Sequence, residues 1–272
     1  MTTTAEAPIA ETPSGGDVPL IELKSVGKSY GNIIALKDIN LSVKAGQVTG
    51  VLGDNGAGKS TLIKIIAGLH QPTEGELLVD GQAMSFASPK DALANGIATV
   101  YQDLAVVALM PVWRNFLLGQ ELRKKGILKS LDINAMRATT ISELKKMGID
   151  LPDVDAPIGS LSGGQRQCVA IARAVFFGAR VLILDEPTAA LGVKQSGVVL
   201  RYITAAKEQG FGVIFITHNP HHAHMVGDHF VLLNRGRQKL DCTYDEITLE
   251  HLTQEMAGGN ELEALSHELG RK

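Results

Sequence analysis

The stretch QVTGVLGDNGAGKSTLIKIIAGL, residues 47–69, decides the fold class. Its centre, GDNGAGKS (53–60), matches the pattern G-x-x-x-x-G-K-S/T, in which a glycine-rich loop holds phosphate groups. The apolar run 47–53 predicts a buried strand before the loop, and the run 60–69 predicts a helix that breaks at Gly68. Because the motif needs a strand before it and a helix after it, this context favours a phosphate-binding loop over a chance glycine-rich turn.

The residue types of this loop suit a nucleoside triphosphate. Glycines allow a tight turn whose N–H groups point at phosphate oxygens, and the start of the following helix adds the positive end of its dipole. Lys59 is placed to neutralise the β- and γ-phosphates, and the Ser60 hydroxyl to ligate Mg²⁺. The nucleotide-binding residues expected here are Gly53, Asp54, Asn55, Gly56, Ala57, Gly58, Lys59, Ser60 and Thr61.

The rest of the chain favours an α/β fold with a mainly parallel central sheet, because short β-branched apolar runs alternate with helical patterns. Residues 21–30 and 33–44 alternate in the manner of strands and predict an antiparallel edge region. The further strands are expected at 180–185, 212–217 and 229–236.

The sequence pattern changes between about residues 104 and 178 and predicts a helical subdomain inserted into this core. Residues 109–125 and 133–149 have the apolar spacing of helices, with Gly and Pro as breakers. We therefore expect one nucleotide-binding domain over 18–256, with a disordered tail at 1–17 and a charged tail, helical in pattern, at 257–272.

Composition limits the classes of function. The chain has 26 Lys and Arg against 29 Asp and Glu, so no basic face for nucleic acid is indicated. Its apolar runs are far shorter than the roughly 18 residues of a membrane span. Residues 1–19 have neither a basic nor an apolar region, so we expect them not to be a secretion signal. Cys168 and Cys242 lack C-x-x-C spacing and are expected to be reduced, structural thiols.

The segment VLILDEPT, residues 181–188, begins with four apolar residues that are followed by two acids, Asp185 and Glu186. A buried strand that ends in adjacent carboxylates must solvate them, pair them or bind them to a metal. Asp185 suits the shell of the Mg²⁺ held by Ser60, and Glu186 is expected to point the other way and polarise the attacking water. The alternative is an ordinary strand end with solvated acids.

A second small-residue turn, LSGGQRQ at 161–167, leads into an amphipathic helical run. The Ser162 hydroxyl and the N–H groups of Gly163 and Gly164 can reach a phosphate, so the turn is a candidate second anion site. Taken alone, it would be an ordinary helix N-cap.

The chain resembles the nucleotide-binding domain of an ABC-type ATPase over about residues 20–255. The resemblance is carried by four motifs in this order: GDNGAGKS, LSGGQ, VLILDEP and ITH. The resemblance implies a P-loop NTPase fold of ABC type, with a mixed central sheet, an antiparallel β edge region and an inserted helical subdomain. It implies ATP and Mg²⁺ as cofactors. It also implies that Ser162, Gly163, Gly164 and Gln165 cap the γ-phosphate of ATP held by a second copy, in a head-to-tail dimer.

The resemblance assigns three further residues. Tyr30 is similar to the aromatic residue that stacks on adenine, Gln102 to the glutamine that ligates Mg²⁺ and senses the γ-phosphate, and His218 to the histidine that contacts the γ-phosphate. The implied metal ligands are then Ser60, Gln102 and Asp185, and the implied catalytic residues Glu186, His218 and Gln102. The sequence departs from the family at Gly192, where an Asp is frequent, so the coupling of the two sites is open.

The histidine-rich run HNPHHAH, residues 218–224, has spacings that could bind Zn²⁺ on a helix. No Cys or acid completes the set, and Pro220 is expected to start the helix after His218. We therefore expect no zinc site here.

The sequences of residues 88–107, 186–197 and 216–224 are similar to those of ATPases of bacterial monosaccharide importers of the ribose and fructose type. This resemblance implies a homodimer on the cytoplasmic face of the inner (plasma) membrane. It docks on separate permease subunits and acts indirectly with a periplasmic or lipid-anchored sugar-binding protein. In the apolar stretch after Gln102, Met110 and Trp113 are the candidate permease contacts, and the alternative is that this stretch forms the subdomain's own core. No nucleic acid is expected. The alternative is a cytosolic ABC ATPase acting on ribosomes or DNA, and no residue names the sugar.

Overall fold

The computed structural model describes residues 18–126 and 129–257. The expected disordered tail 1–17 lies outside the described residues, as does all of the expected C-terminal tail except Ala257. Within the described ranges, no helix is long and apolar enough to span a bilayer.

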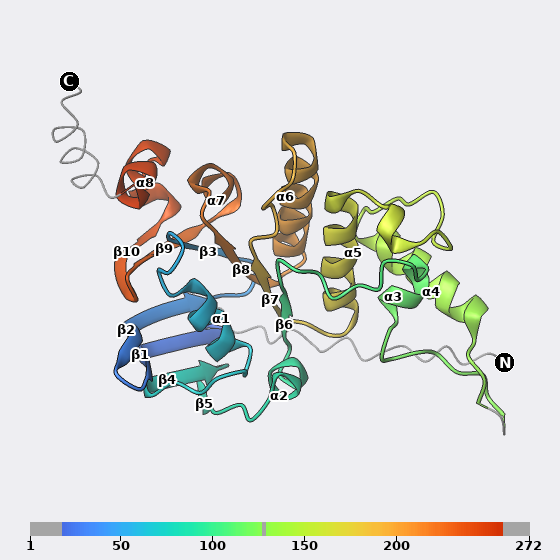
Figure 1. The fold of residues 1–272 in the computed structure, drawn as a ribbon, viewed down its shortest axis with the longest axis horizontal. Coiled ribbons are helices and arrows are strands. Elements are labelled where there is room, and N and C mark those ends of the chain that lie inside the picture. Colours follow the sequence, from blue (N-terminus) through green and yellow to red (C-terminus); the bar gives the residue numbers. More distant parts are fainter. Residues whose placement is uncertain (1–17, 127–128, 258–272) are drawn as a thin grey trace.

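A ten-stranded sheet runs through the described residues in the order β5-β4-β1-β2-β10-β9-β3-β8-β7-β6 (Figure 1). The strands are β1 Ile21–Tyr30, β2 Ile33–Val43, β3 Val48–Leu52, β4 Glu74–Val79, β5 Gln82–Met84, β6 Ile97–Val100, β7 Val181–Asp185, β8 Gly212–Thr217, β9 His229–Asn234 and β10 Arg237–Thr243. Strands β9, β3, β8, β7 and β6 pair in parallel, whereas β1, β2, β4 and β5 pair antiparallel. The expected mixed sheet is confirmed. The antiparallel strands β5, β4, β1 and β2 form one side of the sheet, as the expected antiparallel edge region requires, and β5 is the outermost of them.

The helices cover both faces of the parallel strands. They are α1 Lys59–Ile66, α2 Pro89–Ala94, α3 Val112–Phe116, α4 Ile133–Lys146, α5 Gly163–Phe176, α6 Val193–Glu208, α7 Pro220–Val226 and α8 Leu249–Met256, with short 3-10 turns at Ile158–Ser160 and Tyr244–Glu246. Because both faces are covered, nearly every residue of β3, β7 and β8 is buried.

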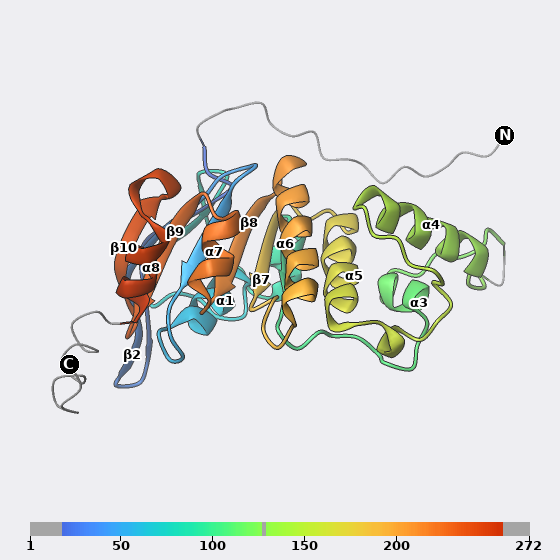
Figure 2. The ribbon, with the colours of Figure 1, turned by 90° about the horizontal axis from the view of Figure 1, so that it is seen from above.

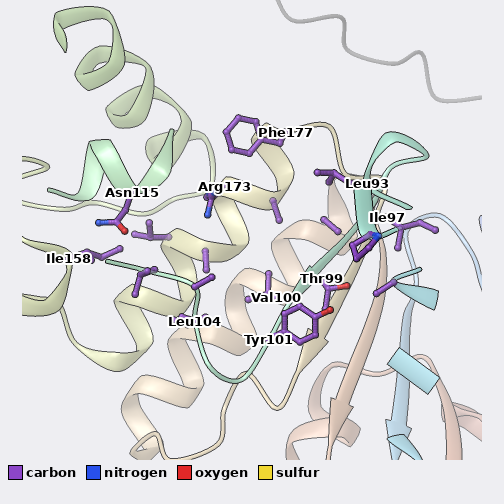
Figure 3. Close-up of a pocket in the computed structure, with 18 residues that line it drawn as sticks. Leu93, Ile97, Thr99, Val100, Tyr101, Leu104, Asn115, Ile158, Arg173 and Phe177 are labelled. Carbon is purple, nitrogen blue, oxygen red and sulfur yellow. The ribbon is translucent and has the colours of Figure 1, made fainter. Parts of the chain in front are cut away.

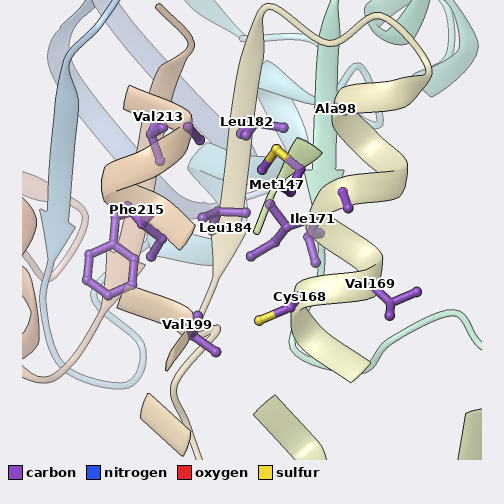
Figure 4. Close-up of a cluster of buried hydrophobic side chains, with 14 of the residues drawn as sticks. Ala98, Met147, Cys168, Val169, Ile171, Leu182, Leu184, Val199, Val213 and Phe215 are labelled. Carbon is purple, nitrogen blue, oxygen red and sulfur yellow. The ribbon is translucent and has the colours of Figure 1, made fainter. Parts of the chain in front are cut away.

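Alternate residues of the central strands enter two separate apolar layers. Leu182 and Leu184 of β7 pack in one layer with residues of α5 and α6, and Figure 4 shows Leu184 beside Ile171 of α5. The intervening Ile183 packs in the layer that contains α1. The period of two along the strand therefore places α1 on one face of the sheet and α5 and α6 on the other.

The region between β6 and β7 is less helical than the sequence pattern indicates. The helix expected over 109–125 spans only Val112–Phe116, since Pro111 precedes its first residue and Gly119 turns the chain with φ of 88°. Helix α4 agrees with its pattern. Figure 2 shows α3 and α4 at the end of the molecule away from β10, while α5 packs against α6 and the sheet.

Trp113 is not a surface residue, contrary to the expectation that it contacts a permease. Its side chain is buried, its Nε1 donates a hydrogen bond to Asp155 at 2.9 Å, and the guanidinium of Arg137 lies 5.7 Å from its ring centre. An indole this well packed serves the helical region itself. Met110 is half-buried, and the exposed apolar residue beside it is Leu109, at 90%.

We predict that neither cysteine reacts with iodoacetamide at pH 8 in the folded protein. Burial is the main cause that raises the pKa of Cys168 to about 12 and that of Cys242 to about 11. The thiolate is the reacting species, and a thiol with a pKa of about 11 is ionised to about one part in a thousand at pH 8. Mass spectrometry after brief labelling should find no adduct in buffer and two adducts in guanidinium chloride. Labelling of either thiol in buffer at the rate of free cysteine contradicts this.

Candidate functional site

The phosphate-type loop follows β3 directly and leads into α1. Gly53 adopts φ of 149°, and a Cβ on it would lie 2.5 Å from the Leu233 carbonyl oxygen. Gly58 adopts φ of 107°, and a Cβ on it would lie 2.6 Å from the Leu36 side chain. Only glycine fits both positions. Gly58 precedes α1 without a side-chain cap, so the start of the helix is left for a bound anion.

Lys59 lies under this loop and is 8% exposed. Its Nζ donates to the carbonyl oxygens of Gly53 at 2.5 Å and Asp54 at 3.0 Å. A buried ammonium held by two loop carbonyls places one positive charge where the loop turns. The loop is therefore suited to the phosphates of a nucleotide.

The parallel strands bring the other sequence-predicted residues to the same edge. Ser60 follows β3, Gln102 follows β6, Asp185 ends β7 and His218 follows β8, and these four strands are consecutive in the order β3-β8-β7-β6. Their carboxyl ends therefore share one edge of the sheet, where ligands of open α/β sheets bind.

Glu186 and His218 are in direct contact. Their Oε1 and Nδ1 atoms are 2.9 Å apart, and the Glu186 carboxylate also accepts a hydrogen bond from the Thr217 hydroxyl at 3.4 Å. The Glu186 side chain is 10% exposed, whereas that of His218 is 58% exposed. The pair thus combines a shielded carboxylate with a ring open to solvent.

The direction of Glu186 has a different origin from the one expected. The strand β7 ends at Asp185, and Glu186 has φ of 48°, so the chain leaves the strand there. Its N–H donates to the Ile216 carbonyl oxygen at 3.0 Å, which holds the turn against β8. A left-handed residue, and not the alternation of a strand, separates the two carboxylates.

The donor set of Ser60, Gln102 and Asp185 fits a magnesium ion, because all three offer the oxygen ligands that this ion prefers. Burial and the neighbouring charge of Glu186 raise the pKa of Asp185, and the charge of Lys59 opposes them. A bound divalent cation would relieve this electrostatic cost. Ser60 and Gln102 are exposed and therefore accessible to an ion.

Tyr30 ends β1 with 42% of its surface exposed. The ring of His70 meets it edge-on at 5.7 Å, and the Lys28 ammonium lies 5.3 Å from its centre. Ile33 and Ile34 beside it are exposed as well. This accessible aromatic surface can stack on a planar base.

The Ser162 turn forms a capping box on α5. The Ser162 hydroxyl accepts from the N–H of Gln165 at 3.3 Å, and the Gln165 side chain accepts from the N–H of Ser162 at 2.9 Å. Gly163 is required by packing, since a Cβ there would lie 2.6 Å from Leu191. This turn and the loop at 53–58 belong to helices on opposite faces of the sheet.

Gly192 is the N-cap of α6. It has φ of −68° and ψ of 159°, provides no side-chain cap, and a Cβ on it would meet nothing within 4 Å. Glycine is therefore not needed there for steric reasons.

The histidines of 218–224 have separate partners. His222 Nδ1 lies 2.9 Å from the Thr188 hydroxyl oxygen, and His224 stacks on Phe230 and contacts Tyr244. Among residues 18–126 and 129–257, no three His, Cys, Asp or Glu side chains are grouped to hold a metal. Thr188 and Thr217 carry no sequence signal for this site, and His222 is considered from sequence only as a zinc ligand, because only the pairing of β7 with β8 brings their segments together.

An apolar cavity of about 280 Å³ lies between the chain that carries Gln102 and helix α5 (Figure 3). Tyr101 and Leu104 line one side, and Arg173 and Phe177 of the α5 region line the other. Burial lowers the pKa of Arg173, whose guanidinium donates to the Leu118 carbonyl oxygen at 2.8 Å.

Known proteins resemble this chain in sequence. The ABC transporter family model matches residues 36–189. The xylose/arabinose import ATP-binding protein of Sulfolobus acidocaldarius is 41% identical over 237 residues, 87% of this chain and 93% of that protein. The fructose import ATP-binding protein of Rhizobium meliloti is 38% identical over 248 residues, 89% of this chain and 95% of that protein. The ribose import ATP-binding protein of Corynebacterium glutamicum is 35% identical over 93% of this chain, which spans 48% of its length.

Solved structures share the fold. The ADP conformation of an ATP-binding cassette of an ABC transporter superposes with a TM-score of 0.77 at 22% identity, covering 91% of this chain and 98% of that one. A dimeric bacterial ABC transporter cassette gives a TM-score of 0.68 at 29% identity, covering 82% of this chain and 98% of that one.

We predict that Gly192→Asp stabilises the protein by about 0.5 kcal/mol, because Asp caps a helix and complements its dipole. Urea denaturation measures the change. Gly192→Ala is the matched control, since it adds a Cβ without an acceptor and is expected to be no more stable than wild type. Equal midpoints for the two variants would contradict the capping argument.

Proposed function

This chain belongs to the ABC transporter family of ATPases, and we propose that it energises import of a monosaccharide through a separate permease. It binds ATP with Mg²⁺ and hydrolyses it. The observation that carries the mechanism proposed below is the contact between Glu186 and His218 at the sheet edge that holds the phosphate loop. The sugar class rests on the relatives named for import of xylose, arabinose and fructose.

Binding of ATP uses both ends of the site. Tyr30 stacks on the adenine, and residues 53–61 surround the phosphates with N–H groups and the positive end of α1. Lys59 exchanges its loop carbonyls for phosphate oxygens, which are the stronger acceptors because they carry charge.

Ser60, Gln102 and Asp185 would hold Mg²⁺. The ion supplies neutralisation of the charge on the β- and γ-phosphates. Gln102 also reports the presence of the nucleotide to the helical region, because the chain after it lines the cavity against α5.

Hydrolysis places a water molecule between Glu186 and the γ-phosphate. Glu186 accepts a proton as the water oxygen bonds to the γ-phosphorus, and the bond from that phosphorus to the β-γ bridging oxygen breaks to leave ADP and phosphate. His218 contacts the γ-phosphate and holds the carboxylate of Glu186 in place. Thr217 supports the same carboxylate from the end of β8.

A second copy completes each site. Residues 162–165 cap the γ-phosphate bound by the other chain, in a head-to-tail ATP sandwich, and the N-terminal end of α5 favours that negative charge. The dimeric cassette that is 29% identical to this chain supports this arrangement.

The permease docks beside the helical region. Leu109 is 90% exposed and Val107 is 46% exposed, and both lie on the segment that continues from the wall of the apolar cavity. The chain would then be peripheral on the cytoplasmic face of the inner (plasma) membrane, and act indirectly with a periplasmic or lipid-anchored sugar-binding protein. The relatives do not favour the alternative of an ATPase acting on ribosomes or DNA.

We predict that Glu186→Gln binds ATP but hydrolyses it at least about a hundredfold more slowly, because the amide cannot accept the proton from water. The variant should accumulate an ATP-bound dimer, seen by light scattering. Ser162→Arg is the control, which should bind ATP as a monomer. Turnover of Glu186→Gln near the wild-type rate would remove Glu186 from its role.

We predict that this chain, purified by affinity from gently solubilised native membranes, brings a polytopic permease with it. Leu109→Asp should weaken that association, because it places a charge on the exposed apolar segment. Mass spectrometry identifies the partners. Ribosomal or DNA-bound partners without a permease would leave the ATPase intact and overturn the import assignment.

A further inference from the structure

Two segments that carry the catalytic pair are joined a second time, away from the catalytic atoms. Glu186 begins one segment and His218 begins the other, and their side chains meet at 2.9 Å. Two residues after Glu186, the Thr188 hydroxyl oxygen lies 2.9 Å from Nδ1 of His222, four residues after His218. The two contacts tie the same pair of segments at two separate points.

The Thr188 side of this contact lies in a conformationally demanding stretch. Glu186 and Ala190 adopt φ of 48° and 58°, values that side-chain-bearing residues rarely take. Turn hydrogen bonds from Ala189 to Glu186 and from Leu191 to Thr188 shape this stretch locally. Thr188 is only 6% exposed, and its side chain connects this stretch to His222 of α7. A buried hydroxyl that lost its partner would leave an unsatisfied polar group.

Hydrogen bonds connect His222 to the segment that carries His218. Asn219 caps helix α7 by accepting from the N–H of His222 at 3.2 Å, and its own N–H donates to the Thr217 hydroxyl oxygen at 3.1 Å. The chain from Thr217 to His222 is thus one hydrogen-bonded unit. A displacement of His222 therefore moves His218.

The chemistry of the ring suits a permanent contact. Burial and the neighbouring His221 and His218 lower the pKa of His222, so the ring is neutral at neutral pH. A neutral imidazole can accept the Thr188 hydroxyl proton at Nδ1.

We propose that Thr188 and His222 are positioning residues, whose hydrogen bond holds Glu186 and His218 at their working separation during ATP hydrolysis. This inference rests on the roles proposed above for Glu186 and His218. Neither residue touches the nucleotide in this scheme. Their loss acts through the placement of the catalytic pair, to which reaction rates are sensitive.

The test compares turnover and ATP affinity in two matched pairs of variants. Thr188→Val removes the hydroxyl with little change in shape, and Thr188→Ser keeps it. His222→Leu removes the ring nitrogen, and His222→Asn offers an amide near the position of Nδ1. We expect the Val and Leu variants to lose about tenfold in kcat with KM for ATP unchanged, and the Ser and Asn variants to stay within about twofold of wild type.

The double variant Thr188→Val/His222→Leu separates a shared contact from two independent effects. Because both changes delete one hydrogen bond, the double variant should be about as slow as either single variant. Thr140→Val is the control for loss of a buried hydroxyl, since Thr140 donates to the Met136 carbonyl oxygen within α4. It should lower Tm without lowering kcat.

Three outcomes would overturn the positioning role. The first is a wild-type kcat in Thr188→Val. The second is a tenfold loss of kcat in each single variant that multiplies in the double variant. The third is a loss of kcat in Thr140→Val as large as that in Thr188→Val. Should Thr188→Val not fold, the His222 pair decides by the same criteria. Glu186→Gln is measured alongside. If it turns over normally, the proposed catalytic role fails, whereas an inactive Glu186→Gln beside a fully active Thr188→Val refutes the positioning role alone.

Discussion

The site depends on the parallel pairing of β3, β8, β7 and β6. Parallel strands end at the same edge, so one topological constraint brings together a phosphate loop, a glutamine, two carboxylates and a histidine from four distant parts of the chain. The pairing is held by apolar side chains that alternate between two layers, each covered by its own helices. A polar site of this kind needs no dedicated domain, because it forms where these strands stop.

Much of this could be predicted from the sequence because the signals are local. Residues 47–69 and the apolar runs of β7 and β8 are contiguous stretches. The spacing of apolar residues within each stretch indicates its secondary structure. The helix expected over 109–125 failed for a physical reason. Apolar spacing cannot show that Asn115 turns its side chain back to hold the carbonyls of Val107 and Met110 in a loop.

Features that depend on pairs distant in sequence were beyond such reasoning. Trp113 lies in a stretch that resembles the docking region of its family, and no local signal shows that its indole bonds Asp155, 42 positions away. Glu186 was assigned its direction from strand alternation, but a left-handed backbone sets it. The bond between Thr188 and His222 joins residues 34 positions apart and carries no sequence signal of its own. In each case the tertiary context decides which atoms meet.

The two apolar layers also bear on how such a chain can change over time. The side chains of α1 pack only with their own face of the sheet, and those of α5 and α6 with the other. Compensating exchanges of large and small residues on the α5 face can therefore accumulate without altering the support under the phosphate loop, since contact is short-ranged. The sheet acts as a partition that lets the α5 face change while the packing that supports the phosphate loop keeps its shape.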